Sequence, residues 1–380
     1  MNQNSSVRIN KNNKFSKIIA LFLLIIFVPM PIGFGLKELT LSCFIGLFGL
    51  VLFRSIKFNN IKNTVVLFLI SSLATLVGIL KGSDFSYFQY LRCLSFPILL
   101  ILFLEADIKK IFFLTLDKLI PLIVLGAYLS LFFYFIIQSD LYNSTLSIPY
   151  EDALYKRIFI YPTYFFLILF IISVLDQKKS QFFYIPILAS SGSKSLLLSM
   201  MLVYLYSMFL NYSVKKVFIL ISALFILYYF VTLFGLFDRV YDFIEYGDPW
   251  RIEEPLAAIK FLTSDLIHFL IGGGSGLTYW TGRETFFTDF VDESRLIINS
   301  SYDIHNGFLT IAMRFGVPLA IFYFYQLYKK IPKIEGRNLI ALVLAVNIYL
   351  SHGPVQLVEA IGLLFGIRLI GFYKLNNYYR

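Results

Sequence analysis

Long apolar runs recur along the whole chain of 380 residues, and they limit its possible folds more than any other feature. A helix that crosses the hydrocarbon core of a bilayer needs about 20 apolar residues. We therefore predict an all-α fold of the polytopic membrane class, with about twelve transmembrane helices and one long outer loop that carries short amphipathic helices. The predicted spans lie near residues 18–32, 39–53, 64–80, 86–104, 119–137, 158–175, 181–192, 195–210, 217–237, 307–327, 338–352 and 355–373.

The placement of the basic residues favours the same topology. Hydrophobic residues make up 58% of the chain and charged residues 15%, yet the formal net charge is +10. Lys and Arg are scattered over short segments between the apolar runs, and segments rich and poor in them alternate, as the positive-inside rule requires. This alternation puts both termini on the cytoplasmic side. It also explains the charge better than a nucleic-acid partner does, because the basic residues form no patch with aromatic neighbours.

This topology divides the chain into three parts. Residues 1–237 hold the first nine predicted spans, residues 238–306 form one long outer loop, and residues 307–380 hold the last three spans. The loop contains 12 Asp or Glu and 5 Lys or Arg residues, and a long loop on a helical scaffold is where function is expected. The run at 181–192 is short, and a segment that crosses only part of the membrane is an alternative there.

Within the loop, the stretch EEPLAAIKFLTSDLIHFLIGGGSG predicts one helix that starts at Pro255 and ends at a glycine cluster. We expect this helix to lie on the membrane surface or to cap the helix bundle. Its predicted apolar side consists of Leu256, Ile259, Leu262, Leu266 and Ile267.

Arg251 precedes this helix in the sequence DPWRIEEP. An arginine at a helix start is well placed to bind an anion, because its fork donates two parallel hydrogen bonds and the helix dipole adds to them. The alternative is an ion pair with one of the neighbouring carboxylates. Both interpretations stay open from the residues alone.

The glycines at 272, 273, 274 and 276 do not predict a nucleotide site. A phosphate-binding glycine loop follows a strand and opens a helix, whereas this cluster follows a helix. We expect a helix C-cap and a tight turn here.

His305 and Asn306 stand where the polar loop changes into the apolar run at 307–327. A histidine at this boundary can accept a proton near neutral pH. The alternative is a helix start in which Asn306 or Asp303 is the N-cap and His305 has no chemical role. Arg314, inside the apolar run, is expected to face a bundle interior or a wet cavity, because a charge is costly elsewhere in such a run.

Two acidic clusters, YDFIEYGD and FTDFVDES, do not have the pattern of a metal site. Neither alternates carboxylates with further oxygen donors, as a hard-cation site does. We expect solvated loop faces there, with neither a metal nor a cofactor.

Four stretches of this sequence together resemble the O-antigen polymerase and O-antigen ligase family of bacterial envelope enzymes. His305-Asn306, nine residues and then Gly316 is similar to the clearest motif of that family. WRIEEPLAAIKFLTSDLIHFLIGGGSG resembles its arginine, amphipathic helix and Gly-x-Gly turn. GSKSLLLSMML resembles its Ser-Arg turn with Lys194 in place of the arginine, and KRIFIYPTYFFLILF resembles its arginine-to-proline segment. The resemblance covers residues 155–370.

This resemblance implies a GT-C-like membrane fold and a metal-independent, inverting glycosyl transfer at the periplasmic face of the bacterial inner membrane. The implied donor is a saccharide on undecaprenyl pyrophosphate. His305 and Arg251 would then be catalytic. The residues that would bind the substrate are Asn306, Lys194, Arg157, Arg283 and Arg314.

Of the functions in this family, we favour polymerisation of O-antigen or related repeat units into a surface polysaccharide. The alternative is a ligase that transfers the finished glycan to lipid A-core, and a second alternative is a polytopic transporter or flippase. The partners expected are lipid-linked oligosaccharide repeat units, membrane lipids and a chain-length regulator protein, without nucleic acid or a cofactor.

Overall fold

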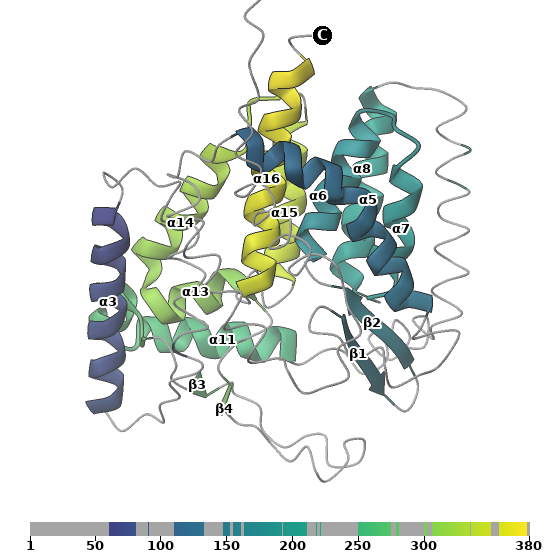
Figure 1. Ribbon diagram of the computed structural model, residues 1–380. Helices are drawn as coiled ribbons and strands as arrows, with labels where there is room; N and C mark the ends of the chain where they lie inside the picture. The colour runs from purple at the N-terminus through teal and green to yellow at the C-terminus, as the bar shows by residue number, and fades with distance from the viewer. Residues whose placement is uncertain are drawn as a thin grey trace, which may run out of the picture.

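The computed structural model describes part of the chain, which Figure 1 shows as ribbons. Four predicted spans, at 18–32, 39–53, 86–104 and 217–237, lie mainly outside the described residues. The described residues are 61–80, 90, 110–132, 147–152, 155–160, 163–191, 193–210, 218, 221, 250–274, 279–280, 300–301, 306–334, 336–350 and 357–377.

Helices dominate the described residues, and their positions follow the remaining predicted apolar runs, in keeping with the all-α part of the prediction. They are α3 (Ile61–Leu80), α5 (Lys110–Phe132), α6 (Thr163–Leu175), α7 (Gln181–Ala189), α8 (Lys194–Leu210), α11 (Trp250–Thr263), α12 (Leu266–Ile271), α13 (Gly307–Phe315), α14 (Val317–Lys330), α15 (Arg337–Tyr349) and α16 (Leu357–Asn377).

The prediction of a polytopic membrane fold with twelve transmembrane helices is wrong for this structure. None of the helices in the described ranges is both long and apolar enough to cross a membrane. Several predicted spans are shorter helices than the roughly 20 residues required, and the run at 307–327 is divided at Gly316 into α13 and α14, of 9 and 14 residues. The longer α16 carries Glu359, Arg368 and Lys374 among its apolar residues.

Two short antiparallel hairpins accompany the helices. β1 (Ser147–Asp152) pairs with β2 (Tyr155–Ile160), with Tyr150 opposite Arg157, and β3 (Tyr279–Trp280) pairs with β4 (Ser300–Ser301). The span predicted at 158–175 therefore begins too early. Its first residues belong to β2, where Ile and Phe in the segment YKRIFI favour an extended backbone.

α6 is the centre of the larger packed group of helices. Every residue from Tyr164 to Val174 is buried, and α6 packs against α7, α8 and α16. Gly366 of α16 permits a close approach to α6, since a Cβ at this position would lie 2.4 Å from Cδ1 of Ile168. A helix apolar on all sides thus becomes the core of this group.

The beginning of α6 is held by a carboxylate from far along the chain. Glu359 of α16 is buried, and its two carboxylate oxygens accept hydrogen bonds from the backbone N–H groups of Thr163 and Tyr164, each at 3.0 Å. The first N–H groups of a helix have no acceptor within the helix, and a negative charge there also favours the helix dipole. Glu359 therefore fixes the start of α6 against α16.

Replacing Glu359 should destabilise the fold. In Glu359→Ala the N–H groups of Thr163 and Tyr164 lose their acceptor, which costs about 1–3 kcal/mol for a buried unsatisfied group such as that of Tyr164. We expect a lower thermal midpoint for the purified protein, followed by circular dichroism. Glu359→Gln, which keeps one acceptor oxygen, should lie between Glu359→Ala and the wild type. An unchanged midpoint in Glu359→Ala would contradict this role.

Candidate functional site

The second packed group of helices contains the residues singled out from the outer loop and its end. α11 packs against α12 and α13, and α12 packs against α13 and α14. Figure 1 shows α11 and α13 lying together in the lower half of the view, with α14 rising from the end of α13. Residues 250–274 and 306–330 are thus brought together across the intervening loop.

The helix predicted to start at Pro255 is two helices. α11 already begins at Trp250, and it ends at Thr263, because Asp265 starts α12 by accepting a hydrogen bond from the N–H of Ile267 at 2.9 Å. The buried face of α11 consists of Glu254, Ala258 and Leu262, spaced by four residues.

The predicted apolar side of this segment is mostly exposed, with Leu262 as the exception. The exposed members are Leu256, Ile259, Leu266 and Ile267.

The glycine cluster forms the C-cap and turn expected from the sequence. Gly272 ends α12 with a φ of 76°, and its N–H donates to the carbonyl of His268. The next two N–H groups cross to the other helix, Gly273 donating to the carbonyl of Met313 at 2.7 Å and Gly274 to that of Arg314 at 3.2 Å. The last carbonyls of a helix have no partner within it, so this turn satisfies the end of α13.

Gly316 lies against the same turn from the other side. It has a φ of 85°, and a Cβ at this position would lie 2.2 Å from the carbonyl oxygen of Leu270. A Cβ on Gly272 would lie 2.5 Å from the carbonyl carbon of Arg314. The two chain turns therefore meet backbone to backbone, at a distance that only glycine allows.

Asn306 is the N-cap of α13, as one of the two interpretations predicted. Its side-chain Oδ1 accepts a hydrogen bond from the N–H of Leu309 at 3.1 Å, and the residue is buried. Gly316 is the C-cap of the same helix, so the nine residues between Asn306 and Gly316 are the whole of α13. His305, which is bonded to the N-cap, lies outside the described residues.

Arg314 lies in the last turn of α13 with only 1% of its surface exposed, and it is among the largest fully buried side chains. Its burial agrees with the expectation that an arginine in this run faces an interior. Glu254 on α11 is also fully buried. Sequence reasoning did not select Glu254 as a site residue, although it stands three residues after Arg251 and so on the same side of the helix.

The other predicted site residues are located by their backbone only. Arg251 is the second residue of α11, Lys194 is the first residue of α8, and Arg157 lies in β2; their side chains are outside the described part. Arg283 is not among the described residues at all. The structure brings the helices of Arg251 and Asn306 into contact, and α8 reaches this group indirectly, because α8 and α13 both pack against α15.

Comparison with known proteins adds no family to this geometry. No protein-family model and no curated protein matches the chain. Within the described ranges, no three side chains of His, Cys, Asp or Glu lie together as a metal site would require.

Gly316 should tolerate no side chain. A non-glycine residue in its backbone conformation costs about 1–3 kcal/mol in strain, and the contact with Leu270 adds to this cost. We expect Gly316→Ala to lower the free energy of unfolding by at least that amount, measured by thermal or denaturant unfolding. Gly371→Ala is the matched control, because a Cβ there would meet only the side chain of Pro332 at 3.5 Å. Equal stability of the two variants would refute the backbone contact.

Asn306 should be replaceable by other N-cap residues. Asn306→Ala removes the acceptor for the N–H of Leu309, which we expect to lower the free energy of unfolding by about 1 kcal/mol. Asn306→Asp and Asn306→Ser can both accept this hydrogen bond and should be close to wild type in unfolding experiments. A loss of stability as large in Asn306→Asp as in Asn306→Ala would mean that capping is not its structural role.

Proposed function

We propose that this protein is a glycosyltransferase that polymerises O-antigen or related surface-polysaccharide repeat units. It transfers the growing glycan from undecaprenyl pyrophosphate to an incoming lipid-linked repeat unit, at the periplasmic face of the bacterial inner membrane. The observation that carries the proposal is the contact between two segments that resemble the same family. The turn at Gly272–Gly274 caps α13, the helix that lies between Asn306 and Gly316.

The packing of α11 on α13 supports a shared anion site. Arg251 lies in the first turn of α11, where the free N–H groups and the dipole of a helix favour an anion. The guanidinium group suits a pyrophosphate because it can donate two parallel hydrogen bonds to neighbouring oxygens. Arg251 is therefore assigned to the leaving group, whose negative charge grows as the glycosyl bond breaks.

His305 is assigned to the acceptor. The acceptor hydroxyl oxygen attacks the anomeric carbon of the donor sugar while the bond from that carbon to the pyrophosphate oxygen breaks. The electron pair of this bond leaves with the undecaprenyl pyrophosphate, and the hydroxyl proton passes to His305, so the anomeric configuration inverts. Proton transfer of this kind contributes about 10²–10⁴-fold to a rate.

The remaining residues have supporting roles in this proposal. Asn306 holds the helix end next to His305 by capping α13. Lys194, Arg157, Arg283 and Arg314 are assigned to the charged parts of the substrates. Membrane lipids and a chain-length regulator protein are its proposed partners, and no step of the transfer uses a metal or a cofactor.

The assignment is tested by single substitutions in a strain whose polymer depends on this gene. His305→Ala and Arg251→Ala should each lower polymer formation by at least about 100-fold, because each removes a group that acts on the reacting bond. Polymer length is read from a lipopolysaccharide gel, and immunoblots of the membrane fraction check the amount of protein. Normal polymer from either variant would rule the assignment out.

Two comparisons sharpen the experiment. Lys260→Ala changes an exposed lysine further along α11 and should leave the polymer unchanged. Deletion of the gene separates the polymerase from the ligase. Lipopolysaccharide capped with single repeat units indicates a polymerase, whereas bare core with accumulated lipid-linked polymer indicates a ligase.

A further inference from the structure

The turn between α14 and α15 lies against the ends of two other helices. A Cβ on Gly336 would be 2.9 Å from Cδ1 of Leu175, the last residue of α6, and a Cβ on Gly371 of α16 would be 3.5 Å from Cγ of Pro332. Figure 1 shows the ends of α14 and α16 at the top of the molecule, away from α11 and α13. The α14–α15 turn, the C-terminal end of α6 and the last turns of α16 thus form one end of the structure.

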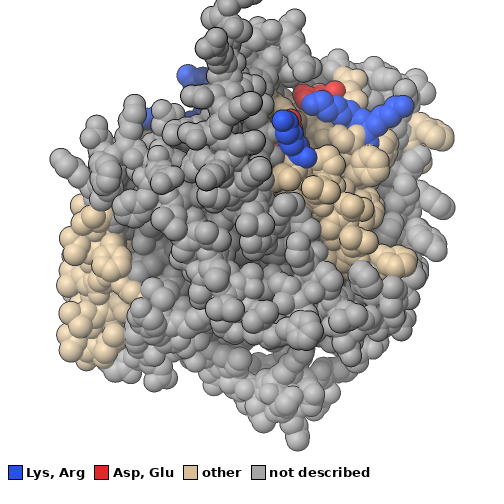
Figure 2. Space-filling view, in the orientation of Figure 1, with Lys and Arg blue, Asp and Glu red and all other residues tan. Residues whose placement is uncertain are grey.

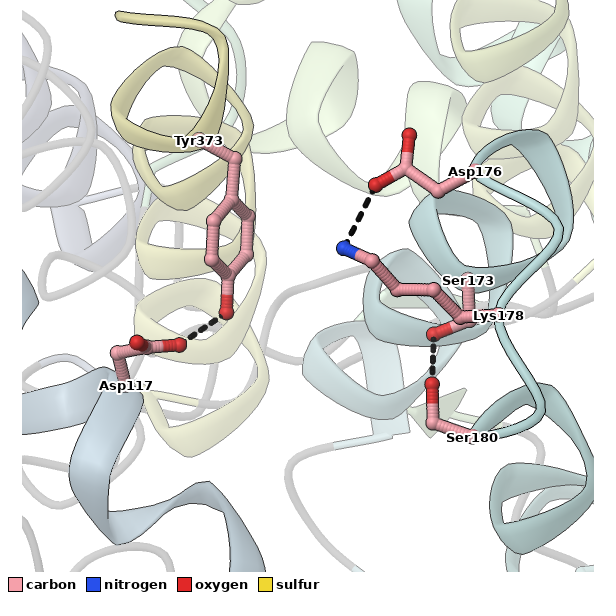
Figure 3. A network of polar contacts seen from close by, with 6 residues as sticks. All are labelled: Asp117, Ser173, Asp176, Lys178, Ser180 and Tyr373. Carbon is pink, nitrogen blue, oxygen red and sulfur yellow. Dashed lines mark hydrogen bonds and ion pairs between the residues drawn. The ribbon is translucent and has the colours of Figure 1, made fainter. Parts of the chain in front are cut away.

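A polar network joins α5 to the same end, as Figure 3 shows. Lys178 forms an ion pair with Asp176 at 2.7 Å, and its Nζ lies 5.3 Å from the centre of the Tyr373 ring. The hydroxyl of Tyr373 donates a hydrogen bond to the carboxylate of Asp117 on α5. Burial raises the pKa of Tyr373 and the hydrogen bond to Asp117 raises it further, so the phenol stays protonated. Asp117 and Asp176, the two carboxylates among the described residues of this end, are therefore engaged locally.

Basic side chains outnumber these two carboxylates among the described residues of this end. Figure 2 shows the described Lys and Arg side chains of the visible face gathered along its upper edge, above a surface drawn in tan. We call this surface the basic end and define it by Lys118, Lys178, Lys179, Lys329, Lys333 and Arg337.

Three helices carry exposed apolar residues near a lysine of the basic end. On α5, Lys118 is followed on the same side by Leu122, Leu125 and Leu129, at helical spacing and all exposed. Phe182 and Phe183 are exposed in the first turn of α7, and the exposed Lys179 lies in the turn that precedes this helix.

On α14 the exposed apolar residues come before the lysine in the sequence. Ile321, Tyr325 and Tyr328 are 64%, 58% and 42% exposed, and the exposed Lys329 follows them. The exposed apolar stripes of α5 and α14 thus each end at a lysine, and the exposed pair on α7 lies next to one.

We propose that the basic end docks on the anionic headgroups at the surface of a lipid bilayer, where the exposed apolar residues beside its lysines enter the interface between headgroups and acyl chains. Lysines bind lipid phosphates while their aliphatic stems and neighbouring tyrosines stay in apolar surroundings. A nucleic acid would match the charge but not the apolar stripes. The inference rests on the membrane location included in the proposed function and not on the glycosyl-transfer chemistry.

The test measures which lipids the full chain selects. Purified protein is mixed with vesicles of phosphatidylcholine alone or of phosphatidylcholine with phosphatidylglycerol, and the fraction bound to each kind of vesicle is measured by co-sedimentation. We expect a preference for phosphatidylglycerol of roughly threefold or more, which weakens as salt is added. Equal binding to both kinds of vesicle, or a preference that salt does not change, would overturn the proposal.

Substitutions then locate the preference. The triple variant Lys118→Gln, Lys179→Gln, Lys329→Gln spares the Lys178–Asp176 pair and should remove most of the preference. Lys329→Gln alone should reduce it, whereas Lys260→Gln, an exposed lysine on α11, is the matched control and should not. Circular dichroism confirms that each variant is folded. A preference retained in a folded triple variant, or one abolished by competing duplex DNA, would refute the lipid assignment.

This outcome is separable from the proposed function. Arg251→Ala should lose polymer but keep the lipid preference, because Arg251 lies on α11 and not at the basic end.

Discussion

The contact between two glycine turns determines how the second group of helices is arranged. The turn after α12 donates its N–H groups to the last carbonyls of α13, while Gly316 leaves room for the backbone of Leu270. Both turns have positive φ angles, so neither can be formed by an ordinary residue without strain. The contact between the two turns therefore holds the end of α12, the end of α13 and the start of α14 together.

The position of the N-cap of α13 depends on this contact, because α13 is short and its two ends move together. α13 has nine residues, and at 1.5 Å per residue it is about 13–14 Å long. Its C-terminal end is held by Gly273 and Gly274, and its side is held by α11 and α15. The position of Asn306, and of the peptide bond that joins it to His305, follows from these constraints.

Buried polar groups connect this group to the rest of the structure. Asn347 of α15 donates hydrogen bonds to the hydroxyl of Ser199 on α8 and to the carbonyl of Val343. Glu359 holds α6 against α16 in a similar way. A buried donor or acceptor without a partner is costly, so such pairs restrict which helix faces can meet. Since α15 contacts both α8 and α13, the helix that begins at Lys194 is linked to the helix that begins after Asn306.

Some local signals were read correctly from the sequence, the N-cap at Asn306 as one of two open interpretations. The N-cap at Asn306, the glycine C-cap at Gly272 and the burial of Arg314 all depend on local chemistry, and the structure confirms them. The extent of each helix depends on more than apolarity. Gly316 divides one apolar run, Asp265 divides a predicted helix by capping α12, and β2 takes the start of another run. Glu254 and Glu359 could not be identified, because their burial arises from helices that are distant in the sequence.

The distance along α14 separates the two proposed anion-binding roles, one at the glycine junction and one at the basic end. α14 starts after Gly316 and ends at Lys330, and its 14 residues span about 21 Å. This length is too great for one phosphate to contact both the basic end and the glycine junction, where α12 and α13 meet. Arg314 lies at that junction and Lys329 lies at the other end of α14. An arginine buried beside a packed backbone suits a fixed, specific contact, whereas exposed lysines above apolar stripes suit exchangeable headgroups.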